Sequence, residues 1–318
     1  MLHAMSSALP SLRQLRYLVT LSETLNFRRA AESLFVTQST LSAGIKELEN
    51  VLGAILVERD KRNVRFTTLG SDVVDRARKM LAQAEDLVRI ARGSQEPLTG
   101  LLRLGVIPTI APFLLPLVLP ALREARPSLQ LYLREDLTER LIDQVESGDL
   151  DFALIALPYD TGDLVVQELF RDEFWFVARQ DDKLSRDKEI AVREIDPARV
   201  LLLEEGHCLR DHAIEACGTR RMSSRQSGLE ATSLFTLLQM VDNGMGVTLL
   251  PEMVIKAGAL TGTALTARPF SHRVPARQIA LVRRRSSPLA TDFDLLAELI
   301  SAQHSKTSRT RVPARSKR

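Results

Sequence analysis

The sequence has little cysteine and few aromatic residues, and this scarcity excludes several classes of protein. Two cysteines in 318 residues are too few for a disulfide-stapled secreted scaffold. Aromatic residues make up 5% of the chain, and its longest apolar run is interrupted by Pro112, Pro116 and Pro120. That run is too short for a membrane-spanning helix. The N-terminus also lacks a basic region followed by an apolar segment, so we expect a cytoplasmic protein without membrane contact.

Acidic residues are scarce toward the two ends of the chain. Residues 1–92 carry 14 Lys/Arg against 10 Asp/Glu, and residues 303–318 carry 6 basic residues and no acidic one. The body between them is acidic, although the whole chain has a formal net charge of +3. A basic front beside an acidic body predicts that the front meets a polyanion. The tail at 303–318 has no apolar periodicity, and we expect it to be disordered.

The front of the chain has the apolar spacing of a small helical domain. Helices are predicted from Leu12, over 27–35, and after Thr37, which can cap a helix N-terminus. This is the order of a helix-turn-helix, and the charged hairpin predicted at 56–70 would form a wing. Short polar residues on the third helix would approach base edges, while basic wing residues would contact phosphates. The predicted DNA-binding residues are Gln38, Ser39, Thr40, Ser42, Lys46, Arg59, Arg62 and Arg65.

Residues 70–93 have glycine only at their ends and no proline, which predicts one long helix. Apolar residues recur there at heptad spacing, which is typical of a helix that pairs with a second copy of itself. An amphipathic helix packed on its own body is the alternative. The predicted dimer seam consists of Val73, Ala77, Met80, Ala84, Leu87 and Ala91.

Beyond a hinge at 93–100, short apolar strands alternate with helical segments. This alternation predicts parallel strands joined by crossover helices, in two lobes with a binding cleft between them. Lobe I would take in about 100–165 and 276–302, and lobe II about 166–275. The predicted fold class is therefore an α/β multidomain protein with a winged helix-turn-helix at 1–69, a linker and dimerisation helix at 70–93, and a two-lobed α/β sensor domain at 94–302.

Both cysteines lie in one short segment, EEGHCLRDHAIEAC at 204–217. Cys208 begins a predicted helix, where the helix dipole, Arg210 and a protonated His207 would favour the thiolate. If the segment is helical, the Cα atoms of Cys208 and Cys217 lie roughly 13 Å apart, whereas a disulfide needs about 7 Å or less. Oxidation and the helix would then exclude each other. Packing residues, a metal clip and a hydrolase nucleophile stay open as alternatives, although the spacing fits no common metal site.

One long run resembles a known family. Residues 30–70, AAESLFVTQSTLSAGIKELENVLGAILVERDKRNVRFTTLG, are similar to the winged helix-turn-helix of LysR-type transcriptional regulators. The resemblance implies binding to double-stranded promoter DNA. It also implies dimer contacts through the linker helix and a sensor domain that resembles periplasmic binding proteins.

Within that family the chain resembles the peroxide-sensing activators. The similar stretches are LRLGVIPTIAPFLLP, RRSSPL, and GHCLRD with a second cysteine nine positions after the first. The resemblance implies that Cys208 is the peroxidatic cysteine and Cys217 the resolving one, joined reversibly in a disulfide. The peroxide pocket that it implies consists of Thr109, Thr138, His207, Asp211 and Arg284, with Arg283 as the neighbouring candidate for the arginine. Arg210 is added because its charge would favour the thiolate. The chain departs from the pattern at Leu229 and Glu230, where an aromatic residue and an arginine are usual.

These observations predict a DNA-binding regulator that is not an enzyme, needs no cofactor or metal, and activates antioxidant genes when hydrogen peroxide oxidises it. The expected partners are promoter DNA, hydrogen peroxide, further copies of the chain in a homodimer or homotetramer, RNA polymerase and a reducing thiol system. Two alternatives stay open. The first is a LysR-type regulator that binds a small organic effector in the inter-lobe cleft, and the second is a thiol peroxidase.

Overall fold

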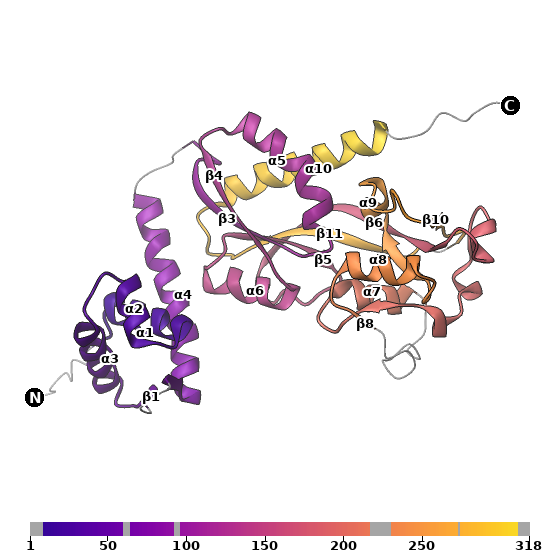
Figure 1. The fold of residues 1–318 in the computed structure, drawn as a ribbon. Coiled ribbons are helices and arrows are strands. Elements are labelled where there is room, and N and C mark those ends of the chain that lie inside the picture. Colours follow the sequence, from indigo (N-terminus) through magenta and orange to yellow (C-terminus); the bar gives the residue numbers. More distant parts are fainter. Residues whose placement is uncertain (1–8, 60–63, 92–95, 217–229, 273, 311–318) are drawn as a thin grey trace, which may run out of the picture. The chain divides into compact units, whose positions relative to one another are not determined.

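The structure is a computed structural model that describes residues 9–59, 64–91, 96–216, 230–272 and 274–310. It divides into two compact units, one formed mainly by the first 94 residues and one by most of the rest. We call them the head and the sensor (Figure 1). Within the described parts of the chain, none of the helices combines the length and apolar character that crossing a bilayer requires.

Three short helices form the core of the head, and polar side chains cap each of them. Ser11, Asn26 and Thr37 accept hydrogen bonds from backbone N–H groups of the first turn, which would otherwise lack partners. The predicted cap at Thr37 is therefore confirmed. Leu18, Leu21, Leu41, Ile45 and Leu48 are fully buried between the helices. These helices are α1 (Leu12–Thr24), α2 (Phe27–Ser33) and α3 (Gln38–Leu52).

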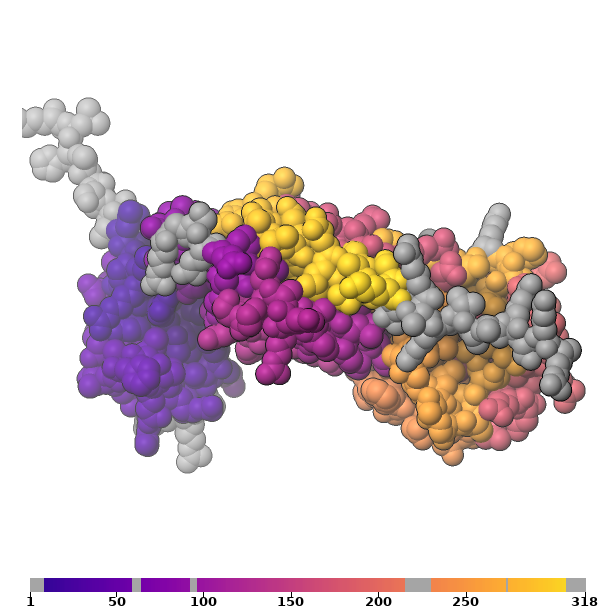
Figure 2. Space-filling model, turned by 90° about the horizontal axis from the view of Figure 1, so that it is seen from above, coloured from indigo at the N-terminus to yellow at the C-terminus, as the bar shows by residue number. Residues whose placement is uncertain are grey.

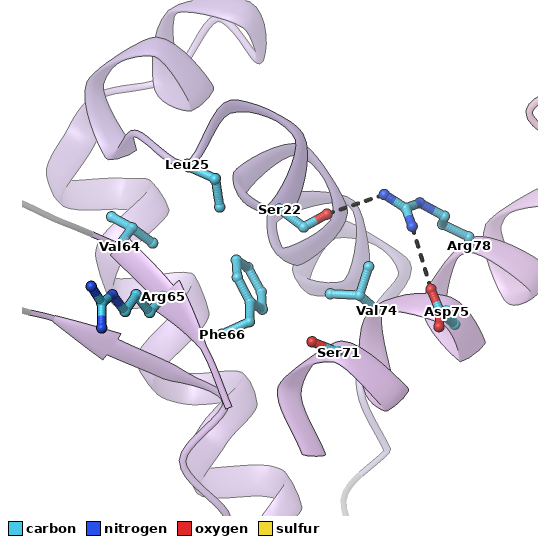
Figure 3. Close-up of a pocket in the computed structure, with 9 residues that line it drawn as sticks. All are labelled: Ser22, Leu25, Val64, Arg65, Phe66, Ser71, Val74, Asp75 and Arg78. Atoms are coloured by element: carbon cyan, nitrogen blue, oxygen red, sulfur yellow. Dashed lines mark hydrogen bonds and ion pairs between the residues drawn. The ribbon is translucent and has the colours of Figure 1, made fainter. Parts of the chain in front are cut away.

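A two-stranded wing follows, formed by β1 (Val57–Arg59) and the antiparallel β2 (Val64–Phe66). It leads directly into the long helix α4 (Thr68–Ala91). A pocket of about 580 Å³ opens between the end of α1, β2 and α4. Figure 3 shows the Phe66 ring directed into this pocket and the Arg65 side chain directed away from it. The strand alternation thus anchors the wing through Phe66 and leaves Arg65 exposed.

The sensor begins with three strands that alternate with two helices, as the sequence predicts. They are β3 (Gly100–Val106), α5 (Ala111–Ala125), β4 (Leu129–Glu135), α6 (Thr138–Ser147) and β5 (Phe152–Leu157). The rest of the unit comprises β6 (Val165–Arg179), β7 (Leu202–Leu203), α7 (Cys208–Ala216), β8 (Glu230–Ala231), α8 (Leu234–Asp242), β9 (Thr248–Pro251), α9 (Glu252–Lys256), β10 (Leu265–Pro269), β11 (Ala276–Arg283) and α10 (Ala290–Thr310).

The main sheet of the sensor is mixed, so the expected parallel pairing is confirmed for the first strands that alternate with helices and fails for the later strands of this sheet. Its seven strands have the order β10-β6-β11-β5-β3-β4, with β9 also paired to β6. The β3–β4 and β3–β5 pairs are parallel, but every pairing of β6 and β11 is antiparallel. Strand β6 pairs with β11 through Glu173 and with β9 from Phe174 onward. The one long strand β6 therefore joins β11 along its first part to β9 along its second part.

Helices cover the sheet on both faces. In Figure 1, α5 and α10 lie together on one face, and α6 lies on the other. Figure 2 shows α10, in yellow, on the surface beside α5. Phe293, Leu296 and Ile300 of α10 are buried against the core, which explains why the chain stays helical. Because α10 continues to Thr310, the expectation of disorder from 303 is wrong over 303–310, and residues 311–318 lie outside the described residues.

Candidate functional site

The outer face of α3 carries the polar residues that the sequence singled out. Gln38, Ser39, Thr40 and Lys46 are exposed, and Ser42 is half-buried. They lie on the side of α3 opposite the fully buried residues Leu41, Ile45 and Leu48. Short polar side chains at the start of an exposed helix can approach the base edges of a major groove. Arg65 is exposed on the wing, whereas Arg62 and the side chain of Arg59 lie outside the described residues.

The predicted dimer seam on α4 is divided between two environments. Ala77 is buried in the core of the head, and Val73 packs against that core, so Ala77 is wrongly placed in a seam for a second copy. Ala84 is half-buried, while Met80, Leu87 and Ala91 are exposed. The start of α4 is amphipathic because it closes the head. Val88 and Ile90, near the end of α4, are also exposed apolar residues, although neither belongs to the predicted seam.

Cys208 is the first residue of α7, as predicted. Gly206 has a φ of +95°, a backbone conformation that favours glycine, and it turns the chain from β7 into the helix. The thiol is buried, with 6% of the residue exposed. Cys217 lies outside the described residues, one position beyond the end of α7.

A buried arginine that the sequence analysis did not select is the cation that acts on this thiol. Arg277 is 1% exposed, and the strand that carries it, β11, contacts α7. Its Nη1 donates to Thr109 Oγ1 at 2.8 Å, and its Nη2 donates to the Thr109 carbonyl at 3.1 Å. Its Nε and Nη2 bind Asp172 Oδ2 at 3.1 and 3.0 Å. The predicted pocket residue Thr109 is therefore part of a buried polar cluster with Arg277 and Asp172.

The thiol is held in its neutral form, contrary to the expectation of a favoured thiolate. Burial raises the pKa of Cys208, and the charge of Arg277 and the Thr138 hydroxyl partly offset this. The Thr138 hydroxyl has no partner of ordinary hydrogen-bond geometry among the described residues, so its contact with the sulfur is loose. Asp211 raises the thiol pKa further through its negative charge. Thr138 and Asp211 thus act on Cys208 directly and Thr109 through Arg277, but desolvation outweighs the helix N-terminus.

Two predicted arginines are directed to other partners. Arg210 Nη1 donates to the Leu203 carbonyl at 2.9 Å and to Glu230 Oε1 at 2.7 Å, so its charge is neutralised by the glutamate that departs from the family pattern. Arg284 Nη1 donates to the carbonyls of Val145 and Leu150, where α6 ends. Both assignments to the pocket are therefore corrected. Arg277, seven residues before Arg284, takes the place that Arg284 was given.

His207 is buried, and its nearest charged partner is Glu204 in the same loop. Its Nε2 lies 4.0 Å from Glu204 Oε1, and burial lowers the pKa of the imidazole, with Glu204 and the Thr232 backbone opposing this. The neutral form is therefore favoured, and His207 does not add the positive charge expected beside the thiol. Tyr159, which the sequence analysis did not select, lies close enough for ionised Cys208 to raise the pKa of its phenol, after burial and Glu139.

The described residues contain no group of three or more His, Cys, Asp and Glu side chains that could hold a metal ion. The metal-clip alternative would have used His207, Cys208, His212 and Cys217, and His212 has another partner. His212 Nε2 lies 3.3 Å from the carbonyl oxygen of Pro158, which ties α7 to the end of β5. The structure thus gives His212 an anchoring contact.

A winged helix-turn-helix head followed by an α/β sensor defines a DNA-binding regulator. Residues 12–71 match the bacterial regulatory helix-turn-helix protein of the lysR family, and residues 95–305 match the LysR substrate binding domain. The chain therefore belongs to the LysR family of transcriptional regulators. This family consists of transcription regulators and not of enzymes.

Several relatives match over nearly the whole chain. The HTH-type transcriptional regulator EstR of Acinetobacter baylyi is 48% identical over 92% of this chain and 97% of its own length. A hydrogen peroxide-inducible genes activator of Haemophilus influenzae is 37% identical over 92% of this chain and 96% of its own. The structure of a full-length OxyR variant from Pseudomonas aeruginosa has a TM-score of 0.77 and 35% identity, and it covers 92% of this chain and 98% of that one.

Proposed function

We propose that this protein is a peroxide-responsive regulator in which Cys208 is the sensing residue. The observation that carries the proposal is the buried cluster in which the Cys208 thiol at the start of α7 meets Thr138 and the charge of Arg277. A cation and hydroxyl donors that face a thiol can stabilise the hydroxide that leaves when the thiolate attacks a peroxide oxygen. Similarity to a hydrogen peroxide-inducible activator and to OxyR supports the same reading.

In the proposed reaction, one hydrogen peroxide oxidises the two cysteine thiols to a disulfide and is reduced to two water molecules. The Cys208 thiolate attacks one oxygen, the O–O bond breaks, and hydroxide leaves and takes up a proton to form water. The sulfenic acid on Cys208 then condenses with the Cys217 thiol, which forms the disulfide and releases a second water. A dithiol of the cellular reducing system would restore both thiols by exchange.

The helix α7 makes the disulfide incompatible with the structure described here. The Cα atoms of Cys208 and Ala216 at its two ends lie about 12 Å apart along the axis. Cys217 follows Ala216 at about 3.8 Å, so it stays at least about 8 Å from Cys208, beyond the roughly 7 Å limit for a disulfide. Oxidation must therefore unwind α7. In the proposed homodimer or homotetramer, this would change how the sensors pair and how the DNA-binding heads are spaced, and so activate transcription.

A mass-spectrometric thiol count tests the proposal. Reduced full-length protein receives a brief, roughly stoichiometric pulse of hydrogen peroxide, and promoter-DNA footprints are taken before and after. We expect the loss of two hydrogens, a sulfenic acid without a disulfide in Cys217→Ser, and no reaction in Cys208→Ser. A changed footprint should accompany oxidation of the wild type alone. If Cys208 stays reduced at low peroxide, the proposal is wrong.

A second candidate is regulation by a small organic effector. It is favoured by the 48% identity to EstR, whose name does not refer to peroxide, and by the neutral state of the buried thiol. In that case Cys208→Ser should keep its full response to the effector. Native mass spectrometry of protein purified from its host would show a bound metabolite.

A further inference from the structure

Asp172 stands at the point where β6 changes partners. It is paired directly with Arg277 of β11, and Glu173 makes the last β6–β11 pair before Phe174 pairs with β9. Asp172 is 1% exposed. A charge so deep in the fold is costly unless its partners satisfy it fully, so the partners of this carboxylate show what it does.

The two carboxylate oxygens serve two different parts of the sensor. Oδ2 accepts a hydrogen bond from Nε of Arg277 and forms an ion pair with its Nη2, and Oδ1 accepts from the backbone N–H of Met253 at 3.0 Å. Met253 lies in α9, which follows β9 directly. Asp172 thus joins the arginine of β11 to the helix that follows β9, across the point where β6 passes from one set of strands to the other.

Asp172 and Thr109 together fix the plane of the Arg277 guanidinium. An arginine side chain has five N–H donors. Among the hydrogen bonds of the described residues, Asp172 Oδ2 accepts one, from Nε, and Thr109 accepts two, from Nη1 and Nη2. Nη2 also forms an ion pair with Asp172 Oδ2 at 3.0 Å. One Nη1 hydrogen and one Nη2 hydrogen take no part in these three hydrogen bonds, and a guanidinium hydrogen can therefore stabilise negative charge that develops at the reacting sulfur or on the peroxide.

We propose that Asp172 is a positioning residue for the reaction of Cys208, because its carboxylate holds the Arg277 guanidinium in place beside the thiol. This inference rests on the proposed reaction of Cys208 with peroxide. The groups that face Asp172 are Arg277, the Met253 amide and His304 of α10. The groups that face Cys208 are Arg277, Thr138, Asp211 and the Leu209 amide. Arg277 is common to both sets, so it carries the effect of Asp172 to the thiol.

An amide cannot replace this carboxylate. Asn has one acceptor oxygen and one donor group, so Asp172→Asn must turn its NH2 group toward either the Arg277 guanidinium or the Met253 N–H. In either orientation two donors face each other, and Asp172→Asn loses its hydrogen bond either to Arg277 or to the Met253 N–H. The matched control is Asp182→Asn. Asp182 Oδ1 likewise accepts from a backbone N–H, that of Leu184, and its Oδ2 pairs with Arg199, but neither residue belongs to the Cys208 cluster.

The test compares the rates at which Cys208 reacts with iodoacetamide and with hydrogen peroxide in reduced full-length protein at pH about 7.5. We expect Asp172→Asn to slow both reactions by about tenfold or more, as a rise of one unit in the thiol pKa would. Asp182→Asn should stay within about twofold of the wild type. If Asp172 only stabilised the fold, Asp172→Asn should instead raise the alkylation rate, because a loosened structure exposes the thiol.

Alkylation of Asp172→Asn at the wild-type rate or faster would overturn the inference. If circular dichroism shows that this variant does not fold, Arg277→Lys replaces it, since an ammonium keeps the charge but lacks the planar fork. The same slowing is expected there, and an unchanged rate would overturn the inference equally. If wild-type Cys208 resists peroxide, the proposed function fails, while the alkylation rates still decide whether Asp172 positions Arg277.

Discussion

The reactivity of Cys208 should rise steeply with pH, because burial keeps its thiol neutral. Burial raises the pKa above the ordinary 9.0, and Arg277 and Thr138 offset only part of that rise. A thiol with a pKa of 9.0 is about 1% ionised at pH 7, so Cys208 must be ionised less than this. Since the thiolate is the nucleophile, its alkylation rate should increase about tenfold per pH unit between about pH 6.5 and 8.5.

The assay uses the full-length Cys217→Ser variant, in which Cys208 is the one remaining cysteine. Iodoacetamide labelling is followed by mass spectrometry over that pH range, with the same protein in urea as the unfolded control. The unfolded thiol should titrate near its ordinary pKa and react faster than the folded one at every pH. A folded-state rate that is flat above pH 7 would show that the thiolate is already formed. The field of Arg277 would then outweigh burial, and our reasoning would be refuted.

Three further predictions concern the head and the fold. A Cβ at position 44 would lie 2.6 Å from Tyr17 Cδ2, so Gly44→Ala should lower the free energy of unfolding of the head by about 1–3 kcal/mol. This loss is larger than the gain of about 1 kcal/mol in helix propensity. An unchanged urea midpoint would contradict the prediction. If Lys46 contacts a phosphate, Lys46→Ala should weaken promoter binding, measured by fluorescence anisotropy. The slope of log K against the logarithm of the salt concentration should become shallower by about 0.9. Burial lowers the pKa of His207 and His304 in the folded protein below the ordinary 6.5. As the pH falls, these histidines are therefore protonated in the unfolded chain before they are protonated in the folded one. The free energy of unfolding should then decrease between about pH 7 and 5. A urea midpoint that stays constant over this range would count against it.

Much of the head and the start of α7 at Cys208 could be predicted from the sequence, because their signals are local. The apolar spacing of α1 and α3 and the cap at Thr37 involve residues within a few positions of one another. The start of α7 at Cys208 is also a local feature. From helix geometry alone it follows that the two cysteines cannot be bridged while α7 is intact.

The sequence did not reveal which charges surround the thiol. Arg277 and Asp172 are 105 positions apart, and the antiparallel register of β6 and β11 pairs them. Arg277 and Arg284 lie seven positions apart, yet one reaches the Cys208 cluster and the other binds the end of α6. Ala77 fits a heptad seam in the sequence but is buried in the core of the head.

The family, the helices of the head and the position of Cys208 at a helix start could all be predicted from the sequence, because short-range spacing and capping encode them. Tertiary structure decided that Arg277 faces the thiol, that Arg210 is neutralised by Glu230, and that the resting thiol is neutral. Strand register and desolvation depend on residues far apart in the chain. No local pattern reports them.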